Sequence, residues 1–126
     1  MRSARLLVID DEPNIGRLFQ RTFRRKHEVV YEQQAATALA RIVLGERFDI
    51  IFCDLMMPRM SGTAFIAQIA TLYPEELERI VVITGGGLDD DSRRFLETTS
   101  RRILYKPFTL AELEQLMTQM LGSACA

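Results

Sequence analysis

The sequence predicts an α/β domain in which helices cover both faces of a doubly wound, five-stranded parallel sheet. Two observations predict this fold. Five short, mostly apolar runs, typical of strands buried on both faces, alternate with segments whose apolar residues recur at helical spacing. Parallel strands also need helical crossovers between them, which this alternation provides. With 126 residues, the chain is long enough for one such domain, which we expect to span residues 1–126.

The first strand is expected at residues 5–9, an apolar run that ends in an acidic segment, residues 10–12. Pro13 then opens a helix, because proline is well tolerated in the first helical turn. Apolar residues at helical spacing give this helix one buried stripe. Positive charges at its carboxyl end are favourable because they interact with the helix dipole. The stripe consists of Ile15, Leu18, Phe19, Thr22 and Phe23, and the closing charges are Arg24, Arg25 and Lys26.

A short second strand is expected at residues 29–31, and a second helix runs from about residue 35 to Gly45. The inward positions of this helix again follow helical spacing. His27 stands in the turn before the second strand. We expect this lone histidine to be exposed and to have no catalytic role.

The third strand, residues 48–54, is apolar until it reaches Asp54, and a loop that contains Pro58 follows. A short apolar run bounded by such breakers is typical of a buried strand. A carboxylate at its end gains nothing from packing, and its desolvation is costly unless other groups compensate the charge. Asp54 is therefore the first candidate for a functional residue.

The remaining elements continue the alternation. A helix follows Ser61-Gly62, and the one at residues 89–98 is polar, with Phe95 and Leu96 as its clear apolar anchors. The helix at residues 89–98 should therefore be the least firmly held of the helices. Thr109 and Glu112 form a capping box at the start of the last helix. The last two strands are expected at residues 79–83 and 102–105, and the last helix has the apolar stripe Leu113, Leu116, Met117, Met120 and Leu121.

Composition excludes several classes of function. The net charge of −1 gives no general attraction to nucleic acid or to an anionic membrane surface. No apolar run approaches the roughly 18 residues of a membrane span, and we expect no signal peptide. We therefore expect neither direct nucleic-acid binding nor membrane insertion. Cys53, in a buried strand, and Cys125, in the tail, are expected to be reduced thiols in a cytoplasmic protein.

Polar residues follow the buried strands at their carboxyl ends. Asp10 and Asp11 follow the first strand, Asp54 ends the third, Thr84 follows the fourth, and Lys106 follows the fifth. Parallel strands all end on the same edge, and ligands bind there at the point where the strand order reverses. For the strand order 2-1-3-4-5, the reversal lies between the first and third strands. The sequence therefore predicts a site in that crevice.

The chemistry of this cluster follows from its charges. At about 4.5 Å and an effective dielectric near 20, each pair of carboxylates costs roughly 3–4 kcal/mol. The one ammonium of Lys106 offsets only part of this repulsion. A hard divalent cation bound by oxygen ligands would neutralise the remaining repulsion, and Mg²⁺ is the natural candidate. With the hydroxyl of Thr84 nearby, Asp54 suits nucleophilic acceptance of a phosphoryl group, and Gly85 and Gly86 leave backbone N–H groups approachable.

At these residues the chain resembles the receiver domains of bacterial two-component response regulators. The resemblance covers essentially the whole chain, and four motifs in the right order make it very specific. The matching motifs are Asp10-Asp11-Glu12-Pro13, Asp54-Leu55-Met56-Met57-Pro58 with Ser61-Gly62, Thr84, and Lys106-Pro107-Phe108.

The resemblance implies a flavodoxin-like fold and the function of a phosphorelay switch rather than an enzyme. Asp54 would accept the phosphoryl group from a phosphohistidine on a histidine kinase or phosphotransfer domain. The resemblance also implies Mg²⁺, with Mn²⁺ as an alternative. Its ligands would be Asp11, Asp54 and the backbone carbonyl of Met56, with Asp10 assisting through water.

Further roles are implied for residues around the phosphoryl group. Thr84 would bond a phosphoryl oxygen and move on activation, and Lys106 would pair with the phosphoryl group. The backbone at Met56 and Gly85 would also contact it. The peptide bond before Pro107 is expected to be cis, as proline permits.

Two features depart from the commonest receiver pattern. Ile103 occupies the switch position, where most receivers have an aromatic that swings inward behind the threonine, so the coupling of Thr84 to a rotating aromatic is open. Three glycines follow Thr84, and Ser100-Arg101-Arg102 replaces a small-residue turn. In both features the chain is more similar to receivers attached to hybrid histidine kinases than to those of transcription factors. The output surface, formed by residues 89–98, 102–105 and the last helix, would control a downstream protein or an attached domain.

Two other functions remain as alternatives. A pseudo-receiver would act only as an interaction surface, but all five site residues are intact. A phosphohydrolase with an aspartyl-phosphate intermediate usually needs a second aspartate at the place of Met56. Because neither Met56 nor Gly86 offers an acid or amide to orient water, we also predict slow self-dephosphorylation. A Ser-His-Asp hydrolase and a dinucleotide-binding protein are excluded, since the chain has one histidine and no Gly-x-Gly-x-x-Gly after the first strand.

Overall fold

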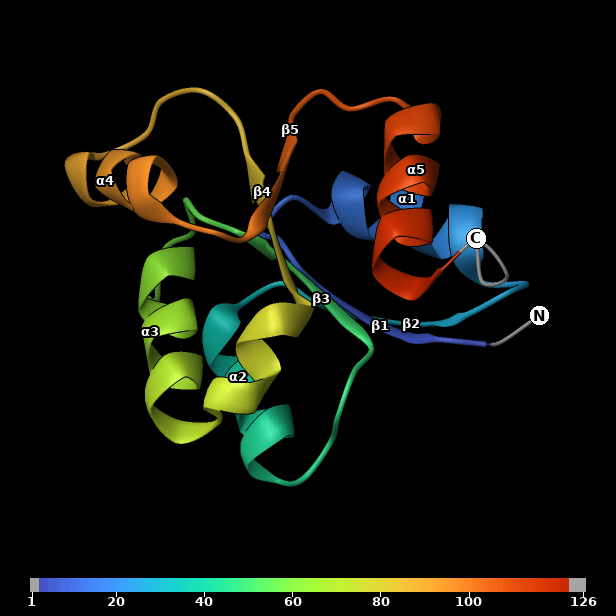
Figure 1. Ribbon diagram of the computed structural model, residues 1–126, viewed down its shortest axis with the longest axis horizontal. Helices are drawn as coiled ribbons and strands as arrows, with labels where there is room; N and C mark the ends of the chain where they lie inside the picture. Colours follow the sequence, from blue (N-terminus) through green and yellow to red (C-terminus); the bar gives the residue numbers. More distant parts are fainter. Residues whose placement is uncertain (1–2, 123–126) are drawn as a thin grey trace.

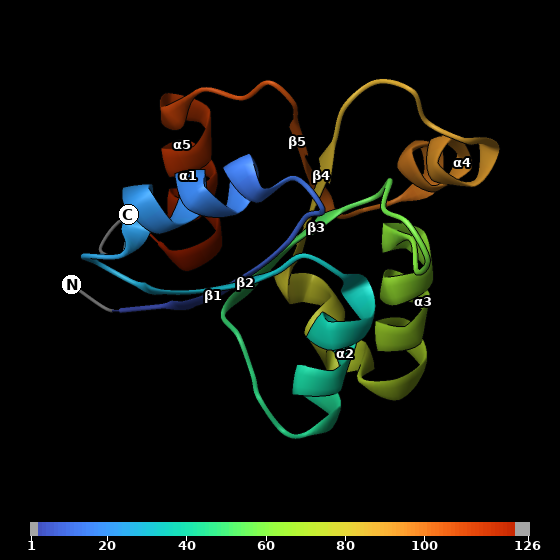
Figure 2. The same cartoon turned by 180° about the vertical axis from the view of Figure 1, so that it is seen from behind.

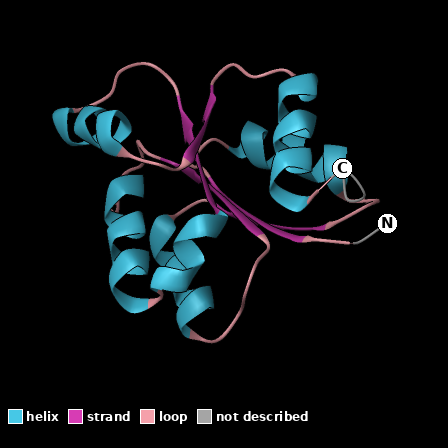
Figure 3. Ribbon diagram, viewed as in Figure 1, coloured by secondary structure: helices cyan, strands magenta, loops and turns pink. Residues whose placement is uncertain are grey.

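The computed structural model describes residues 3–122, so Cys125 lies outside the described part. Its central element is a five-stranded parallel sheet, drawn in magenta in Figure 3, with the predicted order β2-β1-β3-β4-β5. The strands are β1 (Arg5–Ile9), β2 (Glu28–Glu32), β3 (Ile50–Asp54), β4 (Ile80–Thr84) and β5 (Arg102–Tyr105). The helices are α1 (Pro13–Phe23), α2 (Ala35–Val43), α3 (Gly62–Leu72), the 3₁₀ helix η1 (Pro74–Arg79), α4 (Asp90–Thr98) and α5 (Leu110–Leu121). The prediction of a doubly wound, flavodoxin-like sheet is confirmed.

The helices form two layers. Helices α1 and α5 cover one face of the sheet, while α2, α3 and α4 lie on the other side (Figures 1 and 2). Alternate residues of the strands face these two layers, so the core has two clusters, one on each face. The central strands β3 and β4 are buried along their whole length. This burial explains their nearly continuous apolar sequence.

Several helix ends follow the predicted local chemistry. Thr109 and Glu112 form the predicted capping box at the start of α5. The carboxylate of Asp89 accepts a hydrogen bond from the backbone N–H of Ser92 and caps α4. Ser92 is also the one buried residue of α4, whereas Phe95 and Leu96 are half-buried. Among the described residues, no helix is both long and apolar enough to cross a membrane.

The structure differs from the sequence-based expectation near α1. The helix ends at Phe23, before the three predicted closing charges, because the chain turns there and the backbone N–H groups of both Lys26 and His27 bond to the carbonyl of Phe23. The expectation that His27 is exposed is wrong, since only 5% of it is exposed. Its Nδ1 accepts a hydrogen bond of 2.9 Å from the backbone N–H of Ala4. His27 therefore joins the starts of β1 and β2.

Two further differences occur at the opposite edge of the sheet from the predicted site. Strand β3 begins at Ile50 rather than at residue 48, and Asp49 before it accepts a hydrogen bond from the backbone N–H of Arg5. The helix η1 was not expected. Its Glu76 is buried between Arg47 and Arg79, with oxygen-to-nitrogen distances of 3.4 and 3.0 Å.

Candidate functional site

The carboxyl edge of the sheet brings three carboxylates together. Asp10 and Asp11 follow β1, and Asp54 ends the neighbouring strand β3. One carboxylate oxygen from each lies within 4.8 Å of those of the others. This closeness results from the strand order, which places β1 directly beside β3. The crevice predicted from the sequence therefore contains a compact acidic cluster.

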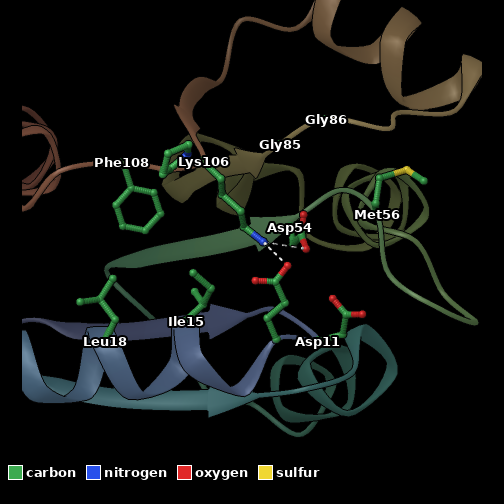
Figure 4. A pocket seen from close by; sticks show the side chains of 11 residues that line it. Asp11, Ile15, Leu18, Asp54, Met56, Gly85, Gly86, Lys106 and Phe108 are labelled. Atoms are coloured by element: carbon green, nitrogen blue, oxygen red, sulfur yellow. Dashed lines mark hydrogen bonds and ion pairs between the residues drawn. The ribbon is translucent and has the colours of Figure 1, made fainter.

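Lys106 reaches this cluster from the end of β5. Its Nζ lies 3.0 Å from Oδ2 of Asp10, 3.4 Å from Oδ2 of Asp54 and 3.5 Å from Oε1 of Glu12. Figure 4 shows the lysine side chain extended between Asp54 and the residues of the β1–α1 loop. The backbone N–H of Lys106 donates to the carbonyl of Thr84, which fixes the start of the loop, and the peptide bond to Pro107 is cis, as expected.

The pKa values of these groups reflect burial and mutual repulsion. Burial, followed by the negative charge of Asp10, raises the pKa of Asp54 to about 6. Burial also raises the pKa of Asp10 above its ordinary value, although a hydrogen bond from the backbone N–H of Glu12 and the nearby ammonium of Lys106 oppose this shift. Burial lowers the pKa of Lys106, but its interactions with Asp10 and Asp54 outweigh this and raise it. The lysine is therefore charged, and it does not neutralise three carboxylates.

The donor set fits a hard divalent cation. Oδ2 of Asp10 is buried and receives no well-directed hydrogen bond from the described residues; its partner is the ammonium of Lys106. With Asp11 and Asp54 it offers three carboxylate oxygens from a small volume. Mg²⁺ and Mn²⁺ prefer such oxygen ligands. These residues could therefore hold the ion that the sequence predicts.

A cavity of about 640 Å³ opens over the cluster. Asp11, Asp54, Met56 and Lys106 line its polar side, together with the backbone at Gly85 and Gly86 (Figure 4). The other side is apolar and consists of Ile15, Leu18, Pro107 and Phe108. A ligand in this cavity would touch both the charged groups and an apolar wall.

Thr84 is buried and Ile103 is half-buried. Thr84 ends β4 beside the cluster, but only 1% of it is exposed, and its hydroxyl lies 3.5 Å from the carbonyl of Gly85. Neither Thr84 nor Asp10 lines the cavity. Ile103 is half-buried and packs against the core cluster that faces α2 and α3. Tyr105, two residues on, is 58% exposed.

The loop after β3 folds closely over Asp54. Gly62 at the start of α3 donates its backbone N–H to the carbonyl of Leu55. A Cβ on this glycine would lie 2.0 Å from the carbonyl oxygen of Asp54. Met56 projects from this loop at the mouth of the cavity (Figure 4), and its sulfur accepts a hydrogen bond of 3.4 Å from the hydroxyl of Ser92.

Some residues of the site were not assigned to it from the sequence. Glu12 was noted only as part of the acidic run, and Ile15 and Leu18 only as part of a core stripe. A signal existed for these three, because Glu12 directly follows the acidic pair and Ile15 and Leu18 lie in the first half of the helix that comes next. Ser92 gave no signal, because its burial depends on how α4 packs on the loop after β3.

The chain belongs to the response regulator receiver domain family, whose model matches residues 6–118. Two relatives illustrate the match. The hydrogenase transcriptional regulatory protein HoxA of Bradyrhizobium diazoefficiens is 32% identical over 76 residues, which are 60% of this chain and 16% of HoxA. The heme response regulator HssR of Staphylococcus aureus is 28% identical over 107 residues, 85% of this chain and 46% of HssR. The chain thus spans less than half the length of these relatives.

Solved structures agree with the fold. The receiver domain of a sensor histidine kinase from Pseudomonas aeruginosa, with magnesium coordinated in its active-site cleft, has a TM-score of 0.80 at 22% identity, covering 97% of this chain and 100% of that one. The chemotaxis protein CheY4 of Vibrio cholerae has a TM-score of 0.78 at 23% identity, covering 95% and 100%. The response regulator TrrA of Thermotoga maritima, in complex with Mg²⁺ and BeF, has a TM-score of 0.74 at 25% identity, covering 93% and 98%.

Proposed function

We propose that this receiver domain is a phosphorylation switch that accepts a phosphoryl group on Asp54 in a Mg²⁺-dependent reaction. The donor is a phosphohistidine on a histidine kinase or phosphotransfer domain. The observation that supports the proposal is the position of Asp54, which lies beside Asp10 and Asp11 and 3.4 Å from the ammonium of Lys106. A nucleophilic carboxylate, further oxygen ligands and a cation are the groups that phosphoryl transfer needs.

In the reaction, a carboxylate oxygen of Asp54 attacks phosphorus in line with the donor. The new O–P bond forms as the P–N bond to the imidazole breaks, and the imidazole nitrogen keeps the electron pair. Lys106 balances the charge on the phosphoryl oxygens, and the backbone at Met56 and Gly85 contacts them. With a pKa of about 6, Asp54 is mostly ionised above pH 7, as a nucleophile must be.

A bound Mg²⁺ would neutralise charge on the transferring oxygens. Asp11, Asp54 and the backbone carbonyl of Met56 would hold it, and Asp10 would assist. Mn²⁺ offers the same preference for oxygen ligands.

The output of the switch is also part of the proposal. Thr84 would respond to the phosphoryl group, with Ile103 in place of an aromatic behind it, and the surface formed by α4, β5 and α5 would contact a downstream protein or an attached domain. The exposed Tyr105 on β5 and the sparse apolar anchoring of α4 support this choice of surface. The origin of the chain in a hybrid kinase and its cytoplasmic location stay predictions.

The test is an intact-mass measurement after incubation with acetyl phosphate and Mg²⁺. Wild type should gain one phosphoryl group, and the gain should vanish in Asp54→Asn and when a chelator removes the metal. Absence of an adduct from the folded wild type would favour a pseudo-receiver. Phosphate release over many turnovers without an accumulating adduct would favour a phosphohydrolase.

A further inference from the structure

Strand β2 supplies a hydrogen bond to the segment that bears the acidic pair. The hydroxyl of Tyr31 donates to the backbone carbonyl of Asp10 over 2.7 Å. Two weaker bonds support the same segment. The backbone N–H of Asp10 donates to the carbonyl of Glu32, and the side-chain amide of Gln33 donates to the carbonyl of Asp11, both over 3.2 Å. Tyr31 and Glu32 of β2, with Gln33 directly after it, thus hold the two residues that follow β1. Strands β1 and β2 are neighbours in the sheet (Figure 1).

Helix α1 leaves space for the tyrosine ring. A Cβ on Gly16 would lie 2.7 Å from three ring carbons of Tyr31, closer than carbon atoms can approach. Glycine inside a helix is unfavourable by about 1 kcal/mol relative to alanine, so this position needs a reason. The ring of Tyr31, packed over Gly16, supplies one. The ring and the hydroxyl of Tyr31 therefore give two independent contacts around the same loop.

The acidic segment needs such support because its carboxylates repel those of β3. Asp10 and Asp11 stand in a loop immediately after a strand, with their oxygens within 4.8 Å of Asp54. Repulsion at that distance pushes the loop away from β3 unless the backbone is anchored.

We propose that Tyr31 is a positioning residue for the divalent cation, because its hydroxyl holds the backbone of Asp10 so that both acidic side chains face Asp54. This inference rests on the proposed Mg²⁺ site. Hydrogen bonds that orient metal ligands from outside the coordination shell typically change metal affinity by about 10–100-fold when they are removed. Tyr31 acts through Asp10 and Asp11 and does not itself touch the cation.

The decisive variant is Tyr31→Phe, which removes the hydroxyl and keeps the ring over Gly16. We expect the Mg²⁺ dissociation constant, measured by titration calorimetry, to rise about tenfold. Phosphorylation of Tyr31→Phe by acetyl phosphate should return to the wild-type rate when the concentration of Mg²⁺ is raised by the same factor. Tyr73→Phe is the matched control, because no hydrogen bond from the hydroxyl of Tyr73 is found within residues 3–122, and its dissociation constant should equal that of wild type.

A second variant tests the same contact from the helix. In Gly16→Ala the new methyl group would displace the ring of Tyr31, so Mg²⁺ should bind more weakly. In the double variant with Tyr31→Phe the hydroxyl is already absent, so Gly16→Ala should cause little further loss of Mg²⁺ affinity. Equal Mg²⁺ affinity of wild type and Tyr31→Phe would overturn the role of Tyr31 while leaving the proposed function intact. A wild type that binds no Mg²⁺ would overturn both, and the absence of an acetyl phosphate adduct would identify that case.

Discussion

The ammonium of Lys106 lies 3.0 Å from a fully buried carboxylate oxygen of Asp10. Lys106 follows β5 at one side of the sheet, and Asp10 follows β1, so the lysine side chain spans the ends of β4 and β3. It is the one cation that contacts the acidic cluster within the described residues. The charge balance of the site therefore depends on a single residue.

The first prediction concerns removal of that charge. Lys106→Met should bind Mg²⁺ more tightly at pH 8, on the order of tenfold, because an ammonium no longer repels the ion from the carboxylates. The same variant should form little phosphoryl adduct, since nothing replaces the lysine beside the phosphoryl oxygens. Titration calorimetry and intact mass measure the two effects. Weaker Mg²⁺ binding at pH 8 would contradict this account of the site.

The second prediction concerns stability and pH. The pKa of Asp54 is about 6 in the folded chain and 3.8 without its surroundings. In the folded state this carboxyl holds its proton more tightly, so its favourable contribution is complete below pH 4 and is lost as the pH rises through 6. Above that range the charged, buried carboxylate destabilises the fold.

Asp54→Asn should remove this loss. We compare the free energy of unfolding of the variant with that of wild type, both without Mg²⁺. The variant's advantage should be about 1–3 kcal/mol larger at pH 8 than at pH 4. Urea denaturation at the two values of pH measures the difference. Added Mg²⁺ should stabilise wild type and have a much smaller effect on the variant. A difference that does not depend on pH would show that the charge of Asp54 is already compensated.

The third prediction concerns the close turn after β3. In Gly62→Ala, the new carbon would lie 2.0 Å from the carbonyl oxygen of Asp54 and 2.6 Å from Cα of Leu55, both of them backbone atoms. The loop must shift, and we expect a loss of about 2–3 kcal/mol in the free energy of unfolding. Gly86→Ala is the control, because no atom lies within 4 Å of the position its Cβ would take. Equal urea midpoints for the two variants would refute the prediction.

Sequence patterns predicted the acidic cluster because they depend on a simple geometric rule. Once the apolar runs are taken as parallel strands, their last residues must meet at one edge, which brings Asp10, Asp54 and Lys106 together. Local chemistry was equally informative at the start of α5, where the capping box involves residues only three positions apart.

Contacts between distant polar residues were not predictable in this way. Nothing in the sequence indicates that Tyr31 reaches the carbonyl of Asp10, since the bond depends on the register of β1 against β2. His27 appeared exposed because its acceptor role depends on the backbone of Ala4, 23 residues away. Glu76 is buried in the unexpected helix η1, where its carboxylate pairs with Arg47 from an earlier loop and with Arg79 of the same helix. Such contacts follow from the fold and not from the local pattern.

The last prediction concerns the lifetime of the phosphorylated form. Met56 stands at the mouth of the cavity with its sulfur near Ser92, and Gly86 on the other side has no side chain. Neither residue can orient a water molecule toward the phosphorus, so self-dephosphorylation should take minutes or longer. Met56→Asn places an amide there and should raise the rate about tenfold. Met56→Leu is the matched control, because it keeps an apolar side chain of similar volume and should stay slow.

The decay can be followed by intact mass after acetyl phosphate is removed in the presence of Mg²⁺. A half-life of seconds for wild type would contradict the prediction, because it would require a group other than the side chains at positions 56 and 86 to orient the attacking water. Equal rates for Met56→Asn and Met56→Leu would show that a side chain at this position does not reach the attacking water. A faster rate in Met56→Leu alone would indicate that the contact with Ser92, and not the missing amide, protects the phosphoryl group.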